Sequence, residues 1–178
     1  GVASITIIRL IGIRFVFYMA LISSMTDTFA YVFGLTFGKH KLAPLVSPKK
    51  TWEGAIGVTI VATIVASVYA LFYGSLFPST TDLGQLFNPS GDQTLLNYFF
   101  GDVINFGWQV VIIVFLSFVG SIISKFGDLA ASKLKRHYEI KDFGKLFPGH
   151  GGILDRFDSM IMVSLYLSAM VYIIELFV

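Results

Sequence analysis

Four aspartates stand inside or beside long apolar segments of the sequence, where a charged side chain is unusual. Asp27 interrupts one such segment, and Asp128 lies close to the end of another. Asp155 and Asp158 begin the last one, and their i, i+3 spacing would place both on one face of a helix. A carboxylate at mid-span costs about 2.5–3.5 kcal/mol on membrane-insertion scales, so it needs a partner or a task. Since carboxylates suit Mg²⁺, the pattern predicts a magnesium site at Asp128, Asp155 and Asp158.

Basic residues and glycines lie along the chain between these carboxylates. The basic residues of this stretch are Lys133, Lys135, Arg136, Lys141, Lys145 and Arg156. A helix that continues past Asp128 would place Ser132 and Lys135 on the same face as that carboxylate. Lysine and arginine bind phosphates, and the glycines that flank His150 would let the backbone approach a phosphate closely. These glycines are Gly149, Gly151 and Gly152. The segment is therefore predicted to bind phosphate groups.

Taken singly, each feature has a simpler explanation. Asp27 can pair with a neighbouring helix, and a glycine cluster also suits a tight turn. Asp155 and Asp158 would gain about 0.3–1 kcal/mol each at a helix N-terminus. The convergence of three carboxylates and six basic residues on one membrane face favours a functional site.

The composition indicates a membrane protein. Of the 178 residues, 55% are hydrophobic and 13% are charged, whereas a soluble domain has about 25% charged residues. This excludes the soluble, disordered and fibrous classes. The net charge of +2 gives no support to nucleic-acid binding, and the lack of cysteine excludes disulfides and thiolate metal sites.

Four apolar segments are long enough to cross a bilayer. They are Phe15–Phe37, Gly54–Phe77, Trp108–Ser124 with an extension over Phe126–Ala131, and Phe157–Val178. The second of them would be about 36 Å long as a helix, against a hydrocarbon core of about 30 Å. The predicted fold is an all-α polytopic transmembrane bundle, a single membrane-embedded domain over residues 1–178. Gly1–Ile8 is apolar but too short to span alone.

The connections between these segments differ in charge. Gly38–Glu53 and Ser132–Arg156 are rich in lysine and arginine, whereas Pro78–Gly107 contains three aspartates and no basic residue. Under the positive-inside rule, both basic connections are cytoplasmic and the acidic one faces the other side. Arg9 and Arg14 fall on the wrong side of this scheme and count against it.

More than a dozen positions between Ser132 and Asp158 fit one family signature. They are Ser132, Leu134, Lys135, Arg136, Lys141, Asp142, Gly144, Phe147, Pro148, His150, Gly151, Gly152, Ile153, Asp155, Arg156, Phe157 and Asp158. A second block consists of Asp27, Thr28, Ala30, Tyr31, Gly38–His40 and Ser47–Gly54, which reads SPKKTWEG. Both blocks resemble the phosphatidate cytidylyltransferase family, also called CDP-diacylglycerol synthases. The likeness covers most of Phe15–Val178.

The resemblance implies that CTP and phosphatidic acid react to give CDP-diacylglycerol and pyrophosphate, with Mg²⁺ as the cofactor. Asp128 and Asp155 are then metal ligands, and Asp158 is a third ligand or a nearby supporting group. Lys135 and Arg136 belong with them to the catalytic set. The substrate-binding set is Asp27, Lys49, Lys50, Glu53, Ser132, Lys141, Asp142, His150, Gly151, Gly152 and Arg156. The resemblance further implies a homodimer in the bacterial inner membrane, its site facing the cytoplasm, and a chain that forms the C-terminal part of a longer protein.

Two other functions are consistent with parts of the sequence. One is a related CTP-using enzyme that acts on another lipid, such as a CDP-archaeol synthase or a polyprenol kinase. The other is a cation transporter whose aspartates line an ion path. The signature favours the phosphatidate enzyme, and three of the four aspartates stand at span ends beside basic loops rather than at mid-membrane. Motifs of P-loop NTPases, zinc proteases and α/β-hydrolases are absent from the sequence.

Overall fold

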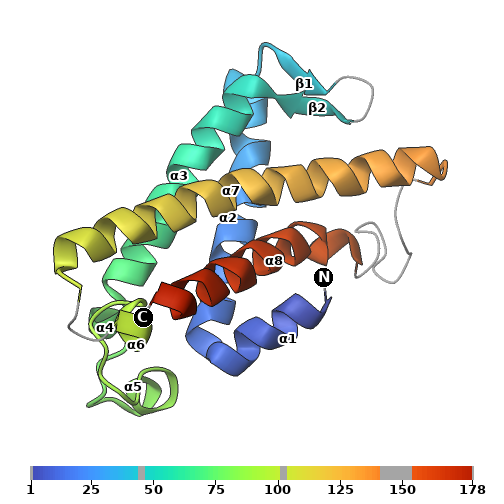
Figure 1. Ribbon diagram of the computed structural model, residues 1–178. Coiled ribbons are helices and arrows are strands. Elements are labelled where there is room, and N and C mark those ends of the chain that lie inside the picture. The colour runs from blue at the N-terminus through green and yellow to red at the C-terminus, as the bar shows by residue number, and fades with distance from the viewer. Residues whose placement is uncertain (1, 44–46, 101–103, 141–153, 178) are drawn as a thin grey trace.

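The computed structural model describes residues 2–43, 47–100, 104–140 and 154–177, and this part of the chain is mainly helical (Figure 1). The helices are α1 (Val2–Ile11), α2 (Ile13–Phe37), α3 (Trp52–Leu71), α4 (Tyr73–Leu76), α5 (Asp82–Phe87), α6 (Asn97–Phe100), α7 (Phe106–His137) and α8 (Leu154–Phe177). An antiparallel hairpin of β1 (Lys41–Ala43) and β2 (Ser47–Thr51) joins α2 to α3. The predicted all-α class is confirmed.

Four helices are long and apolar enough to cross a membrane, as predicted. They are α2, α3, α7 and the Phe157–Ile174 part of α8. Helix α7 has 32 residues, which makes it about 48 Å long, longer than a hydrocarbon core of about 30 Å. It therefore carries Asp128, Ser132 and Lys135 on one uninterrupted helix, as the predicted shared face requires.

The predicted span Gly54–Phe77 is wrong at its end, because α3 ends at Leu71 and the chain then bends into α4. The cause is a pair of backbone hydrogen bonds from a distant loop. Leu95 N donates to Ala70 O at 2.8 Å, and Gly74 N donates to Gln93 O at 3.0 Å. In a continuous helix, Gly74 N would instead have donated to Ala70 O. The loop thus replaces the helical bond and ends the span.

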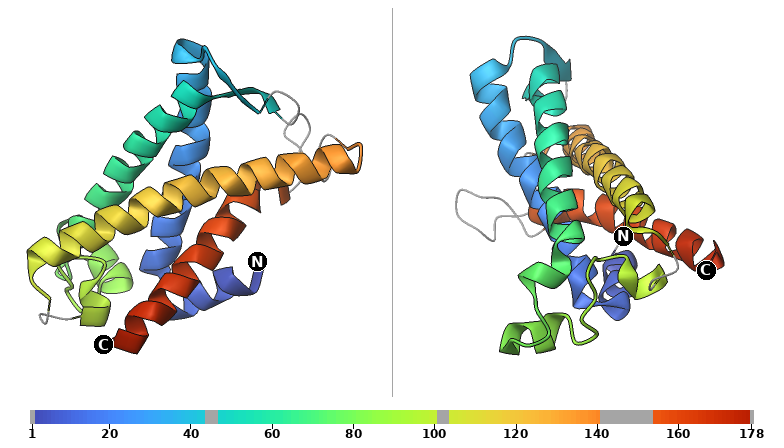
Figure 2. Two further views of the ribbon diagram at one scale, coloured as in Figure 1. Left: turned by 45° about the horizontal axis from the view of Figure 1, so that its top comes forward. Right: turned by 90° about the vertical axis from the view of Figure 1, so that its left-hand side faces the viewer.

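Small side chains line the surfaces where the long helices meet. Figures 1 and 2 show α2 and α3 side by side, with α7 crossing both of them and α8 crossing α2. At this crossing Tyr18 and Ser117 share a hydrogen bond of 2.7 Å, and Ser67 Oγ donates to Ser117 Oγ at 3.2 Å. Gly120 and Ser121 are buried on the same helix as Ser117. Lipid supplies little hydrophobic drive for helix association, so close packing and interhelical hydrogen bonds of this kind hold the bundle together.

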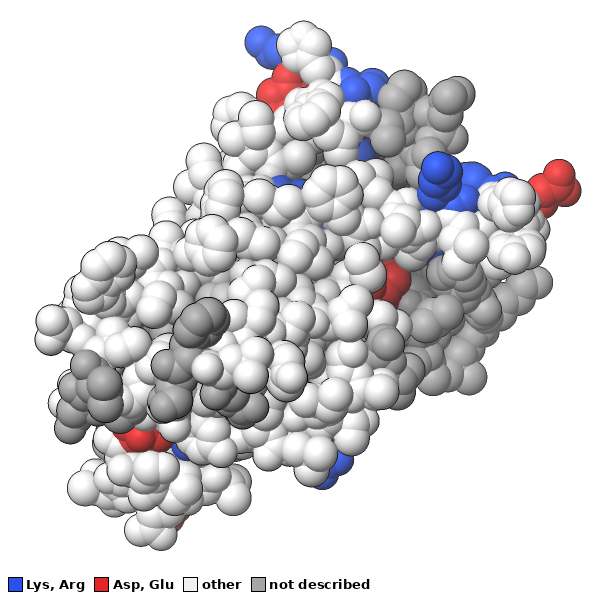
Figure 3. Space-filling view, viewed as in Figure 1, with Lys and Arg blue, Asp and Glu red and all other residues white. Residues whose placement is uncertain are grey.

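The outer surface of the bundle is apolar along its length. Large side chains such as Ile64, Val111 and Phe115 are each 56% exposed, which suits contact with lipid rather than water. On the face shown in Figure 3, lysine and arginine gather around the hairpin and the C-terminal end of α7. The bundle therefore has one distinctly basic end.

Arg14, which counted against the predicted orientation, is a paired residue at the end of the bundle away from the hairpin. Its Nη1 lies 2.5 Å from Asp92 Oδ2, and the two side chains are only 7% and 15% exposed. The guanidinium also lies over the rings of Tyr73 and Tyr98, 5.4 and 5.1 Å from their centroids. Because this charge is neutralised inside the protein, it has little weight in the positive-inside rule.

Candidate active site

A polar cavity of about 580 Å³ lies between α2, α7, α8 and the hairpin, and we call it the active-site cavity. Its lining combines carboxylates, lysines and small or apolar groups: Asp27, Ala30, Tyr31, Gly34, Leu35, Gly38, Lys41, Lys50, Thr51, Asp128, Lys135 and Asp158. The carboxylates come from three different helices, and the lysines come from the hairpin and α7. The fold therefore joins groups that suit a cation with groups that suit phosphates.

The carboxylates of the cavity, Asp27, Asp128 and Asp158, form an acidic cluster whose members interact electrostatically with one another. Ser159 Oγ, which is buried, donates to Asp27 Oδ1 and to Asp158 Oδ1, at 3.3 Å in each case. Its backbone N also donates to Asp158 Oδ1 at 2.7 Å. Ser159 thus holds two of the carboxylates beside each other. Because like charges repel in a partly buried site, the cluster requires positive charge nearby.

Lysines from the hairpin and from α7 balance the acidic cluster. Lys50 Nζ lies 2.5 Å from Asp128 Oδ2, and this ion pair ties β2 to α7. Lys135 interacts electrostatically with Asp158. Ser132, one turn after Asp128, donates to Asp128 Oδ1 over 3.5 Å. The predicted face of α7 therefore lies against the cavity.

The hairpin is held in place by contacts around Glu53, in the first turn of α3. The carboxylate lies 2.5 Å from His40 Nδ1 and accepts hydrogen bonds from the backbone N–H groups of Lys39 and His40, at 3.2 and 3.1 Å. Thr51 caps the same helix by accepting from Gly54 N at 3.2 Å. Glu53 therefore positions the hairpin. Its predicted contact with substrate stays a prediction.

Gly38 allows the chain to pass closely where α2 leads into the hairpin. A Cβ at this position would lie 2.3 Å from Gly34 O and 2.7 Å from Thr51 Cγ2. Both atoms belong to residues of the cavity lining, and the nearer one is backbone, which cannot move aside easily. The absence of a side chain at Gly38 is thus a condition for the shape of the cavity.

Part of the predicted site lies outside the described residues. This applies to Lys141, Asp142, His150, Gly151 and Gly152, and to the side chains of Lys49, Asp155 and Arg156. The backbone of α8 places position 155 one turn before Asp158. Arg136 is described, is exposed, and does not line the cavity. Within the described part of the chain, no three His, Cys, Asp or Glu residues are grouped as metal ligands. The predicted magnesium site therefore needs a group beyond those side chains.

The sequence indicates no role for three residues that the structure brings to this region. His40 stands in the second family block but has no assigned role there, yet it pairs with Glu53. Ser159 had no signal of its own, although its place directly after Asp158 could have suggested a link between carboxylates. Lys125 directly follows the uncharged segment Trp108–Ser124, within the predicted span, which marks it as a polar group inside a span.

Known proteins match this chain over most of its length. The model of the Cytidylyltransferase family matches residues 2–174. The chain is 36% identical over 152 residues to the phosphatidate cytidylyltransferase of Staphylococcus haemolyticus (strain JCSC1435). It is 34% identical to the Staphylococcus saprophyticus protein of that name and 36% identical to the one from Staphylococcus aureus (strain COL), again over 152 residues. Each match covers 85% of this chain and 46% of the relative, so the chain spans about half the length of these curated relatives. With its apolar helices and bacterial relatives, the chain is an integral membrane protein, and it belongs to the cytidylyltransferase family that its motifs resemble.

Proposed function

We propose that this chain transfers the cytidylyl group of CTP to phosphatidic acid, giving CDP-diacylglycerol and pyrophosphate. The observation that carries the proposal is the active-site cavity, in which an acidic cluster meets lysines at one end of a membrane bundle. A reaction between two phosphate groups needs both kinds of charge, because the reactants repel each other. The name shared by the relatives supports the choice of substrates.

The attacking group needs no general base. The phosphate of phosphatidic acid has a second pKa near 6, so it is mostly dianionic at neutral pH. One of its oxygens attacks the α-phosphorus of CTP and forms a new P–O bond. The bond from that phosphorus to the bridging oxygen breaks, and pyrophosphate leaves with the electron pair. The protein has to hold the two phosphate groups in line and offset their repulsion.

The lysines of the cavity are suited to that task. Lys41, Lys50 and Lys135 line it from the hairpin and from α7. Their ammonium groups form charge-assisted hydrogen bonds with phosphate oxygens. Lys50 is already held at the cavity wall by Asp128, at 2.5 Å. We assign these lysines to the phosphates of CTP and of the lipid, together with the predicted Lys141 and Arg156.

Magnesium is part of the proposal. Asp128 and Asp158 fit as ligands, because their carboxylates line one cavity from two helices and repel each other there. Asp155 is the third predicted ligand. Bound Mg²⁺ would supply positive charge to the phosphates and to the departing pyrophosphate. Asp27 and Ser159 would then keep Asp158 in position, since Ser159 bridges the two carboxylates.

The lining of the cavity argues against a cation transporter. Three lysines line the same space as the carboxylates, and they would repel a cation moving along it. An enzyme that joins CTP to another lipid uses the same charges, so the acceptor lipid has to be tested directly.

We further propose that the cavity faces the cytoplasm of a bacterial inner membrane and that two copies of the protein form a homodimer. The lysines around the hairpin and at the end of α7 support this orientation through the positive-inside rule. The dimer rests on the resemblance alone. Cross-linking in membranes would produce a doubled mass if it exists, and an unchanged mass would contradict it.

The function is tested with membranes that contain the chain, CTP tritiated in its cytosine ring, and Mg²⁺. Phosphatidic acid should convert the label into a lipid-soluble product. A phosphorylated archaeal ether lipid, supplied at the same concentration, should give much less product. Because a polyprenol kinase would transfer the γ-phosphate of CTP and leave the cytosine in CDP, a polyprenol is tested with CTP labelled at the γ-phosphorus and should take up no label. A preference for the ether lipid, or label in the polyprenol, would contradict the proposed substrate, and the absence of lipid-soluble tritium with both phosphorylated lipids would contradict cytidylyl transfer.

A further inference from the structure

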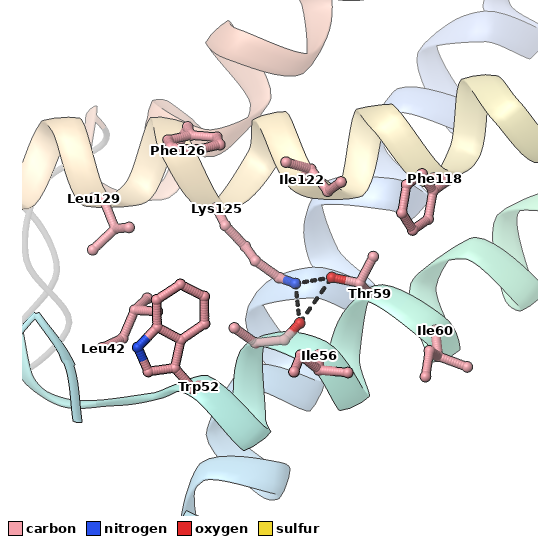
Figure 4. Close-up of a pocket in the computed structure, with 11 residues that line it drawn as sticks. Leu42, Trp52, Ile56, Thr59, Ile60, Phe118, Ile122, Lys125, Phe126 and Leu129 are labelled. Carbon is pink, nitrogen blue, oxygen red and sulfur yellow. Dashed lines mark hydrogen bonds between the residues drawn. The ribbon is translucent and has the colours of Figure 1, made fainter. Parts of the chain in front are cut away.

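A second cavity of about 570 Å³ lies between α3 and α7, and we call it the apolar groove (Figure 4). Its walls include Trp52, Ile56 and Ile60 from α3 and Phe118 and Phe126 from α7. These side chains are between 46% and 62% exposed, although they stand on membrane-spanning helices. The groove therefore opens to the surrounding lipid.

Lys125 is the charged residue in the described walls of this groove. Its side chain extends from α7 across to α3, where Nζ donates to Ala55 O and Thr59 Oγ1 (Figure 4). An ammonium group has three donors, so these two bonds leave capacity for one more acceptor. A lysine inside a span is costly and is by default a candidate for function.

The apolar groove and the active-site cavity lie next to each other. A small space of about 40 Å³ lies between them, and it shares Lys125 and Leu129 with the groove and Lys50 and Asp128 with the active-site cavity. Lys125 and Asp128 are three residues apart on α7, which places them on one face and about 4.5 Å apart along the axis. Lys125 thus lies where the apolar groove meets the active-site cavity.

We propose that the apolar groove holds an acyl chain of phosphatidic acid and that Lys125 binds the phosphate of the same lipid. This inference deepens the proposed function and rests on it. The lipid is favoured as occupant because the groove opens to the bilayer, offers a cation to an anionic headgroup, and leads to the cavity where that phosphate must react. Lys125 is then a specificity-determining residue for the lipid and has no part in binding CTP.

The charge of Lys125 is tested with Lys125→Gln and Lys125→Arg in membranes that contain the full chain. Glutamine can still donate a hydrogen bond across to α3 but lacks the positive charge. Lys125→Gln loses the charge-assisted hydrogen bond from Lys125 to the lipid phosphate, so KM for phosphatidic acid should rise by about 10-fold or more. KM for CTP should change by less than about 2-fold, and Lys125→Arg should restore most of the lipid affinity.

The shape of the groove is tested with Ile60→Trp, which places a larger ring in it. The control is Val111→Trp, an exposed residue of α7 that lies fourteen residues before Lys125, about 21 Å along the helix. The groove variant should raise KM for phosphatidic acid, and the control should not. In the unaltered protein, a phosphatidic acid with a photoactivatable acyl chain should label the peptides around Trp52 or Phe126.

The outcomes of these experiments distinguish a failure of this inference from a failure of the proposed function. If the unaltered protein produces no CDP-diacylglycerol, the proposed function fails. If it does, but Lys125→Gln leaves KM for phosphatidic acid unchanged or raises both KM values equally, the role of Lys125 is overturned. If Ile60→Trp instead disrupts association of two copies, and the lipid probe labels neither wall, a protein occupies the groove and the inference is overturned.

Discussion

Replacing Asp128 by asparagine should remove most activity. Asparagine keeps the size of the side chain and can still accept the hydrogen bond from Ser132, which spans 3.5 Å. It loses the charge that lies 2.5 Å from Lys50 and interacts with the other carboxylates. If that charge holds Mg²⁺ against the phosphates, its loss is comparable to losing one preorganised electrostatic group, about 10²–10³-fold in rate or about 2.7–4 kcal/mol.

The same substitution should leave the fold nearly unchanged. The side chains of Lys50 and Asp128 are 23% and 34% exposed, and an ion pair with this access to solvent contributes about 0–1 kcal/mol. Relief of the repulsion with Asp27 and Asp158 offsets part of that loss. The unfolding midpoint should therefore shift by less than about 4 °C.

The assay measures cytidylyl transfer at saturating Mg²⁺ beside thermal unfolding in the same detergent. Asp82→Asn is the matched control, because Asp82 is an exposed carboxylate on α5, outside the active-site cavity. It should retain full activity. Turnover close to that of the unaltered protein in Asp128→Asn, with normal expression, would refute the proposed role. A loss of activity that follows a loss of stability would show a structural role instead.

Three further predictions concern the fold and its orientation in the membrane. Arg14→Gln leaves the partly buried carboxylate of Asp92 without its partner and should destabilise the protein by up to about 3–5 kcal/mol, seen as a lower unfolding midpoint; an unchanged midpoint would contradict the role of this ion pair. Gly38→Ala should lower activity because the new Cβ meets backbone, whereas Gly107→Ala, with no atom within 4 Å, should not; equal activities would refute the tight turn. The chain has no native cysteine, so cysteines at Lys41 and Gln93 report topology with an impermeant thiol reagent, and labelling from the same side would refute the span assignment.

Much of the fold follows from the sequence because lipid leaves the backbone few choices. A long uncharged segment must satisfy its own hydrogen bonds, so it forms a helix, and the number of spans could be predicted. The end of α3 could not, because it depends on Leu95 and Gln93, which are distant in sequence and bond to Ala70 and Gly74, on either side of that end, only after folding.

Some residues of the candidate site could likewise be predicted from the sequence, and others could not. Asp27, Asp128 and Asp158 could be predicted because carboxylates in or beside apolar segments are unusual, and Lys50 because its block resembles the family. The 2.5 Å contact of Lys50 with Asp128 could not be predicted, because it requires the hairpin to fold over α7. The roles of Ser159 and of the groove around Lys125 could not be predicted for a related reason. The function of a single polar residue in an apolar helix depends on the neighbours that packing brings to it.

CTP labelled with radioactive phosphorus at one chosen position gives the most direct test of the central claim. Membranes containing the chain receive phosphatidic acid, Mg²⁺ and CTP labelled either at the α- or at the γ-phosphorus. Cytidylyl transfer predicts that the α-label enters the lipid phase and the γ-label stays in the aqueous phase as pyrophosphate, and that Asp128→Asn suppresses both products. A γ-label in the lipid, or α-label incorporation that Asp128→Asn leaves intact, would contradict the account.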